Sequence, residues 1–239
     1  MASLEPGPVP QLPLALRAPP DQCLETYLDA PAGAIAQLQA AACTAGGDWL
    51  YLAGAPGTGK THLLLASCAA AEAAGRRAAY LPLQAATGRV RDALEALEGN
   101  DLLTLDGLEC IAGNRDDEIA LFDAHNRARA SGATLVYAAT EQPDALELAL
   151  PDLHSRLSQC TRIVLSPLDE AGRREVLRQR AQRRGLVIEE PALDWLLRRV
   201  GRDLAGLTEL LDRLDRASLA AKRRITVPFL REMLGTASR

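Results

Sequence analysis

The sequence predicts an α/β domain, in which a parallel sheet is covered by helices on both faces, followed by a smaller all-helical subdomain. Three observations predict this arrangement. Short apolar strands alternate with helical segments as far as residue 166, and a glycine-rich turn follows the first strand. Beyond Ser166 and Pro167 only helical patterns remain. Strands that are apolar on both faces are typical of a sheet buried between helices.

The elements of the core follow one another in a regular order. Apolar runs predict strands at 49–53, 77–83, 102–105, 134–139 and 161–165. Helical patterns lie at 34–42, 61–74, 90–97 and 116–130. Gly75 and Gly132 are expected to end two of these helices, because glycine adopts the left-handed conformation of a helix C-cap without steric cost. Further helices are expected at 169–184, 192–200, 204–221 and 227–234.

The first 22 residues have a different composition. Six prolines crowd them, and proline removes backbone donors and blocks helix formation. We therefore expect an extended arm at 1–22, a nucleotide-binding core at 23–166 and a helical lid subdomain at 167–239.

Composition limits the classes of function. The 239 residues carry a net charge of −4 and only 3% aromatic residues, which argues against a module that mainly binds nucleic acid. The five cysteines include no C-x-x-C pair, so the spacing of a zinc site is absent. Because no secretory signal or membrane-length apolar run is seen, we expect a cytoplasmic protein without membrane contact.

The glycine-rich turn at 54–61 matches the phosphate-loop pattern G-x-x-x-x-G-K-[ST] at every fixed position. Its backbone N–H groups and the N-terminus of the following helix are expected to surround phosphates. Lys60 would reach the β- and γ-phosphates, and the Thr61 hydroxyl would bind Mg²⁺. The nucleotide-binding residues predicted here are Gly54, Pro56, Gly57, Thr58, Gly59, Lys60 and Thr61.

A second part of the site is expected at the end of the strand at 102–105. Asp106 follows this strand and would complete the Mg²⁺ site. Gly107 stands where active phosphate-loop nucleoside triphosphatases of this clade usually carry Glu or Asp. Glu109 would point elsewhere if the strand continued, although a turn at Gly107 would bring it back. We therefore expect nucleotide binding with slow hydrolysis.

Several segments together resemble one family, the AAA+ domain of the bacterial replication initiator DnaA and especially its short Hda relatives, the regulatory inactivators. The segments are LDGLECIAG at 105–113, LFD with NR at 121–127, LPDL with SRL at 150–157, and LDRAS at 214–218. Their order and spacing extend the resemblance over nearly the whole chain. It implies an AAA+ phosphate-loop core with a small C-terminal all-α lid.

The resemblance also implies roles for single residues. Arg156, in the loop that carries the SRL segment, resembles the arginine finger that reaches the γ-phosphate in a neighbouring subunit. Taken alone, an arginine there is more often a surface ion-pair residue. Arg202 resembles the sensor 2 arginine, which brings the lid onto the nucleotide. Thr140 lies where sensor 1 places a polar side chain; the alternative is an ordinary threonine at the end of a strand. Tyr27 is expected near the adenine. The implied cofactors are ADP or ATP, with the preference left open, and Mg²⁺.

Residues 11–16 form an apolar segment within the arm. This segment resembles a peptide that docks on the DNA polymerase sliding clamp, which is the β subunit. Gln11, Leu12, Leu14 and Leu16 would fill the apolar groove of the clamp, and the prolines would limit the entropy lost on binding. A disordered linker with stray leucines is the alternative.

The function implied is that of a clamp-tethered negative regulator of chromosomal replication initiation, which stimulates hydrolysis of DnaA-bound ATP in trans through Arg156. The DnaA AAA+ domain is then a partner, and self-association is left open. DnaA proteins continue past the lid into a helix-turn-helix, so we expect DNA contact here to be at most non-specific. The arginine-rich stretch at 173–184 is expected to be a solvated face or partner surface. The alternatives are a stand-alone AAA+ ATPase of the helicase-loader kind and a clamp-loader subunit.

Overall fold

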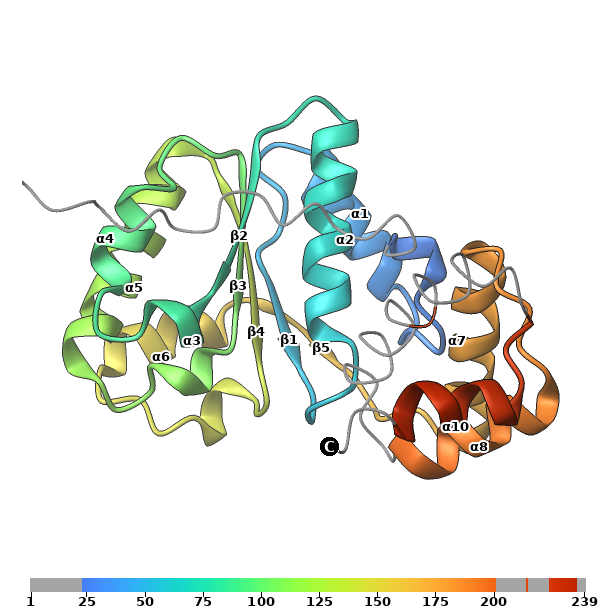
Figure 1. The fold of residues 1–239 in the computed structure, drawn as a ribbon. Helices are drawn as coiled ribbons and strands as arrows, with labels where there is room; N and C mark the ends of the chain where they lie inside the picture. The colour runs from blue at the N-terminus through green and yellow to red at the C-terminus, as the bar shows by residue number, and fades with distance from the viewer. Residues whose placement is uncertain (1–22, 201–213, 215–223, 236–239) are drawn as a thin grey trace, which may run out of the picture.

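The computed structural model describes residues 23–200, 214 and 224–235 and contains both the sheet domain and helices of the lid (Figure 1). The predicted arm and its clamp residues Gln11, Leu12, Leu14 and Leu16 lie outside the described residues, as does Arg202. Most of the helix expected at 204–221 lies outside them as well.

Five parallel strands form one sheet in the order β2-β3-β4-β1-β5. The strands are β1 Leu50–Ala53, β2 Ala78–Pro82, β3 Leu102–Asp106, β4 Thr134–Ala139 and β5 Thr161–Val164. All residues of β1 and β4 are buried, which explains their continuous apolar runs. The predicted parallel sheet is confirmed.

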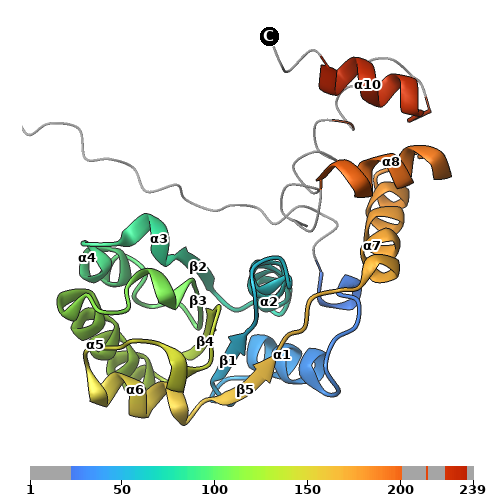
Figure 2. The ribbon, with the colours of Figure 1, turned by 90° about the horizontal axis from the view of Figure 1, so that it is seen from below.

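Helices cover both faces of this sheet, as Figures 1 and 2 show from two directions. The helices of the core are α1 Ala34–Cys43, α2 Lys60–Ala73, α3 Leu83–Ala86, α4 Val90–Glu95, α5 Arg115–Ser131 and α6 Pro151–Ser158. Three 3₁₀ turns accompany them, η1 Leu24–Thr26, η2 Leu108–Cys110 and η3 Pro143–Ala145.

Alternate side chains of strands β1 to β4 enter two separate cores. Leu50 and Leu52 of β1 pack with α1 and α2 on one face, whereas Tyr51 packs with α3 to α6 on the other. This alternation follows from the period of two residues in a strand. These four strands are thus covered on both sides, and the ends of the strands are left to form sites.

Helix α6 was not predicted from the sequence, and the segment that was expected to be a loop there is a helix. Pro151 occupies its first position, where the missing N–H costs nothing, and Leu153 and Leu157 bury one face. Buried Glu118 of α5 accepts hydrogen bonds from the amides of Ala149 (3.0 Å) and Leu150 (2.7 Å). These contacts between distant segments fix where α6 begins.

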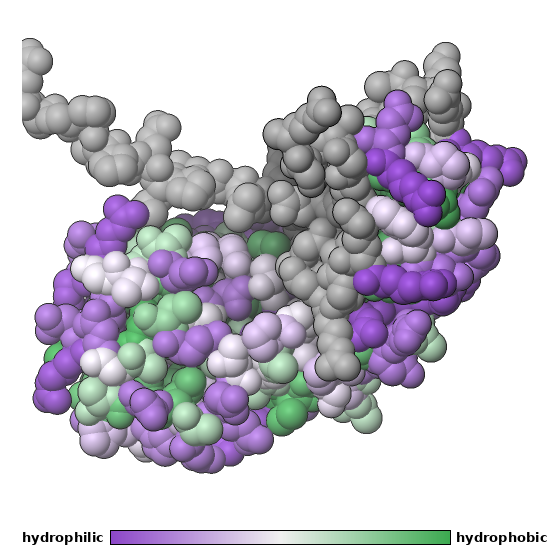
Figure 3. Space-filling view, turned by 60° about the horizontal axis from the view of Figure 1, so that its bottom comes forward, coloured by the Kyte–Doolittle hydropathy of each residue, from purple (hydrophilic) through white to green (hydrophobic). Residues whose placement is uncertain are grey.

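The lid helices are α7 Glu170–Arg183, α8 Glu190–Val200 and α10 Val227–Gly235. They have a core of their own, in which Leu177, Leu193 and Leu230 pack together. Ile188 and Ile225 form a parallel bridge that joins two of the connecting segments. Figure 3 shows hydrophilic side chains over much of the outer surface of this subdomain. The expected all-α lid is confirmed.

Candidate nucleotide-binding site

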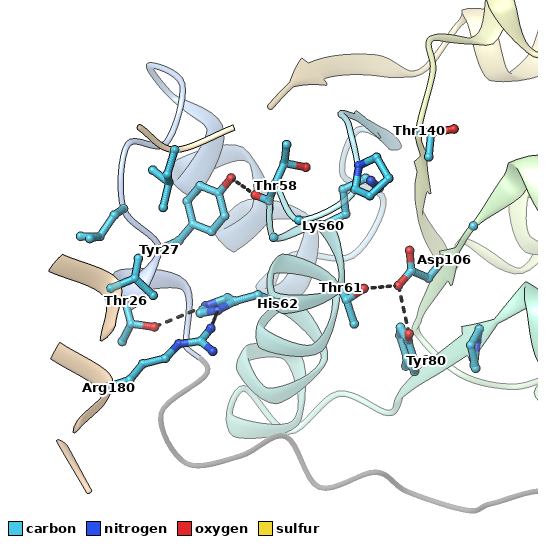
Figure 4. Close-up of a pocket in the computed structure, with 18 of the residues that line it drawn as sticks. Thr26, Tyr27, Thr58, Lys60, Thr61, His62, Tyr80, Asp106, Thr140 and Arg180 are labelled. Atoms are coloured by element: carbon cyan, nitrogen blue, oxygen red, sulfur yellow. Dashed lines mark hydrogen bonds between the residues drawn. The ribbon is translucent and has the colours of Figure 1, made fainter. Parts of the chain in front are cut away.

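The carboxyl ends of β1, β3 and β4 meet the lid around a cavity of about 660 Å³ (Figure 4). All the predicted binding residues that the structure describes line it except Gly54. Those residues are Tyr27, Pro56, Gly57, Thr58, Gly59, Lys60, Thr61, Asp106 and Thr140. Ligands of open parallel sheets bind at this edge, so the position suits a nucleotide.

The phosphate loop joins β1 to α2 and begins with a tightly packed glycine. A Cβ on Gly54 would lie 2.8 Å from the carbonyl oxygen of Leu165 and 2.8 Å from Thr58 Oγ1. Gly59 has φ +89° and is the N-cap of α2, which begins at Lys60. The loop therefore needs one glycine for space and another for conformation, and it points the N-terminus of α2 into the cavity.

Lys60 lies inside the loop with its side chain nearly buried. Its ammonium donates to the carbonyls of Gly54 (2.5 Å) and Ala55 (3.3 Å). Burial lowers the pKa of Lys60, and the carboxylates of Glu109 and Asp106 oppose that shift. A cation held in this way is available to the phosphates that a phosphate loop surrounds.

Thr61 and Asp106 form the pair of oxygen groups expected for Mg²⁺. The Thr61 hydroxyl donates to Asp106 Oδ2 at 2.5 Å, and the Tyr80 hydroxyl donates to the same oxygen at 3.0 Å. Burial and the Asp106 carboxylate raise the pKa of Tyr80 far above its usual value, so its proton stays in place. Mg²⁺ is commonly held by one or two protein oxygens together with phosphates and water, and these residues fit such a site. Within the described residues, no group of three or more His, Cys, Asp or Glu side chains forms a closed metal site.

Glu109 faces the cavity, because β3 ends at Asp106 and the chain turns at Gly107. Gly107 has φ +85° and caps the short turn η2, which contains Glu109. Glu109 Oε2 accepts a hydrogen bond from the amide of Thr140 at 3.1 Å, and both residues line the cavity. Of the two directions that the sequence left open for Glu109, the structure therefore has the one that follows from a turn at Gly107. A carboxylate is present in the site although the position after Asp106 is glycine.

Tyr27 packs directly on the phosphate loop. Its hydroxyl donates to the carbonyl of Thr58 at 2.6 Å, and its ring lies where a Cβ on Gly59 would come within 2.8 Å of it. Burial, with a smaller contribution from Asp29, raises the pKa of Tyr27 to about 12. Tyr27 thus braces the loop as a neutral hydrogen-bond donor in a wall of the cavity.

The lid reaches the same cavity through α7. Arg180 Nη2 lies 3.2 Å from Nδ1 of His62, the residue that follows Thr61. Because a guanidinium can only donate, Nδ1 accepts, and the Nε2–H group of His62 donates to the carbonyl of Cys23 at 3.0 Å. Arg180 therefore connects the lid to the first turn of α2 (Figure 4).

The arginine-rich stretch of α7 is consequently not a uniform solvated face. Arg174 forms ion pairs with Glu190 and Asp194, and Arg178 pairs with Glu175 and Glu190. Arg180 and Arg183 instead line the nucleotide cavity. The helix separates arginines that join the lid helices from arginines that face the site.

Three side chains of the site were not predicted from the sequence, namely Tyr80, His62 and Arg180. His62 carried a usable signal, because it directly follows the phosphate-loop motif on α2. Tyr80 and Arg180 had none, since each reaches the site through a contact between segments far apart in the chain.

Arg156 lies at the amino ends of the strands, on the opposite side of the sheet from this cavity. It occupies the last turn of α6, close to Cys160 and the amino end of β5, whereas Asp106 ends β3 and Thr140 directly follows β4. Arg156 does not line the nucleotide cavity of its own core.

Two family models match the chain. The model described as "Hda, lid domain" matches residues 169–234, and the model of the "ATPase family associated with various cellular activities (AAA)" matches residues 50–165. No helix among the described residues is both long and apolar enough to span a bilayer.

Solved structures with a similar fold include domain III of the replication initiation protein DnaA from Thermotoga maritima. It is 20% identical, with a TM-score of 0.73, and the match covers 91% of this chain and 97% of that chain. AMPPCP-bound DnaA from Aquifex aeolicus is 22% identical, with a TM-score of 0.62, and the match covers 77% of this chain and 62% of that one.

Two further similar structures extend the comparison. A replication initiator DnaA bound to AMPPCP and single-stranded DNA is 22% identical, with a TM-score of 0.65 over 81% of this chain, and the match spans 64% of its length. The RuvB Holliday junction branch migration motor of Thermotoga maritima is 21% identical, with a TM-score of 0.56 over 80% of this chain and 62% of that one. At these identities the likeness shows a common fold.

Proposed function

Because the chain is an Hda-like, DnaA-related AAA+ protein, we propose that it regulates replication initiation by promoting hydrolysis of ATP held by a neighbouring DnaA. In this proposal Arg156 is the arginine finger that acts in trans, and residues 11–16 tether the protein to the sliding clamp. The outcome is a negative regulator, since hydrolysis ends the active state of the initiator.

The position of Arg156 carries the proposal. Arg156 lies in the last turn of α6, on the side of the sheet where the strands begin. The protein's own phosphate loop lies on the opposite side, where the strands end. A guanidinium at the amino ends of the strands cannot stabilise a phosphoryl group that is bound at their carboxyl ends. If Arg156 acts on a nucleotide, that nucleotide belongs to another subunit.

The chain's own nucleotide has a supporting role in this scheme. Lys60 and the loop amides would hold the phosphates of ADP or ATP, and Thr61 with Asp106 would hold Mg²⁺. A bound nucleotide would also lie against Arg180 and Arg183 of the lid. Nucleotide binding would thereby fix the lid on the core and complete the surface offered to DnaA.

Clamp tethering rests on the resemblance of residues 11–16 alone. A tether would raise the local concentration of the regulator near DNA-bound initiator without any additional contact to DnaA.

The test is a hydrolysis assay with DnaA carrying labelled ATP and sliding clamps loaded on DNA. The wild-type protein is compared with Arg156→Ala and with a triple alanine variant at Gln11, Leu12 and Leu14. We expect clamp-dependent hydrolysis that falls to the background rate of DnaA in Arg156→Ala and loses its clamp dependence in the triple variant. Hydrolysis that continues in Arg156→Ala at the wild-type rate would contradict the finger.

A stand-alone AAA+ ATPase is the second candidate, and Glu109 is the observation that favours it. Its carboxylate lies in the cavity with Lys60 and Thr140, where a base that activates water would act. ATP turnover by the purified protein without DnaA, at rates typical of motor AAA+ proteins, would favour this candidate over the regulator.

A further inference from the structure

A second cavity, of about 380 Å³, opens at the amino ends of the strands. Residues that precede β1, β4 and β5 contribute to it, as do the last turns of α5 and α6. Arg129 comes from α5 and Arg156 from α6, so two guanidiniums line a single hollow.

These two arginines lack carboxylate partners within the described part of the chain. None of the ion pairs found there includes Arg129 or Arg156, and Asp48, the one carboxylate of the wall, pairs with neither. Arg127, two residues before Arg129 on the same helix, pairs instead with Glu98 at 2.7 Å. The wall thus carries two positive charges against one negative charge.

A buried histidine lines the same cavity. His125 is 1% exposed, and its Nδ1 lies 2.9 Å from the hydroxyl oxygen of Tyr137, which is itself fully buried. If the Tyr137 hydroxyl donates to Nδ1, only the Nε2–H group of His125 remains without a partner. The opposite direction would leave both the tyrosine proton and the Nε2 lone pair unmatched, so the first arrangement is favoured.

The environment keeps this histidine neutral. Burial, Arg156 and Arg129 together lower the pKa of His125 to about 4. Trp49 packs edge-to-face against its ring, with centroids 4.3 Å apart, and holds it in place. His125 Nε2 is buried and has no hydrogen-bond partner in the described structure, so it can donate to an acceptor that enters the cavity beside it.

We propose that Arg129, Arg156 and the Nε2–H group of His125 form a phosphate-binding pocket, which receives the terminal phosphates of a nucleotide held by a neighbouring AAA+ core. Guanidiniums match the oxygens of phosphate in bidentate geometry, and an NH donor at the wall adds a third point of contact. This inference rests on the proposed function and deepens it, because it makes Arg129 a second cation of the trans site.

The first readout measures phosphate binding without DnaA. The full chain, saturated with Mg²⁺ and ADP so that the phosphate loop is occupied, is titrated with inorganic pyrophosphate while the imidazole signals are followed by NMR. The sequence has three histidines, so each ring is assigned by single substitution. We expect the His125 signals to shift in a saturable way in the wild type and in Arg127→Ala, and to stay unchanged in Arg129→Ala. Unchanged His125 signals in the wild type, or equal shifts in Arg129→Ala, would overturn the pocket.

The second readout is the DnaA hydrolysis assay. We expect Arg129→Ala to reduce the stimulated rate on the order of tenfold to a hundredfold, because it removes one group that stabilises developing charge. Arg129→Lys should recover part of the loss, since lysine keeps the charge without the planar fork. Arg127→Ala, the matched control on α5, should stimulate like the wild type.

The two readouts separate the two proposals. Wild-type protein that shows the His125 shift and yet never stimulates DnaA would refute the proposed function while leaving a phosphate pocket. Normal stimulation by Arg129→Ala together with loss in Arg156→Ala would keep the finger and overturn the role of Arg129.

Discussion

Gly54→Ala tests whether packing, more than backbone conformation, requires the first glycine of the phosphate loop. The added Cβ would lie 2.8 Å from Leu165 O, 2.8 Å from Thr58 Oγ1 and 3.0 Å from Leu165 Cβ. Two of these atoms belong to the segment just after β5, which cannot swing away as a flexible side chain would. Relief therefore requires the loop or the end of β5 to move.

The expected cost follows from these contacts. Overpacking that shifts backbone typically costs about 1–3 kcal/mol. In a domain of this size each kcal/mol lowers the melting temperature by about 2–4 °C, so we expect a decrease of roughly 2–12 °C. The same movement displaces the Gly54 carbonyl that holds Lys60 at 2.5 Å, so nucleotide affinity should fall as well.

The assay is thermal unfolding followed by circular dichroism, with and without Mg²⁺ and ADP. The control is Gly75→Ala, where φ is +77° and no atom lies within 4 Å of the added Cβ. That variant should lose about 1 kcal/mol through backbone strain alone and keep the full stabilisation by ADP. A Gly54→Ala protein that melts within about 1 °C of the wild type and gains the same stabilisation from ADP would show that packing does not require this glycine.

Two further predictions concern charged groups. Glu109→Gln keeps an oxygen that can accept a hydrogen bond from the Thr140 amide but removes the carboxylate. Any intrinsic ATP hydrolysis, measured in single turnovers, should therefore fall by about 10²- to 10⁴-fold, while the affinity for ADP in equilibrium binding is retained. An unchanged hydrolysis rate would exclude Glu109 as the base. The pKa of His125 falls from 6.5 in the unfolded chain to about 4 in the folded one, so the unfolded state binds the extra proton and stability decreases as the pH falls from 6.5 towards 4. His125→Gln should flatten this part of the pH dependence in urea unfolding, and an unchanged slope would contradict the assignment.

The sequence determined the parts of the protein that depend on neighbouring residues. The strands follow from continuous apolar runs, the phosphate loop from eight consecutive residues, and the helix ends from Gly75 and Gly132, both with positive φ. These features are local, because backbone conformation and burial are encoded within one element.

Only the tertiary structure decided which side chains face the sites. The direction of Glu109 depends on a turn at Gly107 and on an amide 31 residues further along the chain. Helix α6, and with it Arg156, begins where buried Glu118 binds the amides of Ala149 and Leu150. Arg180 meets His62 across 118 residues of sequence. Each contact joins elements whose approach is set by the packing of the sheet and the lid, and no pattern within one segment records it.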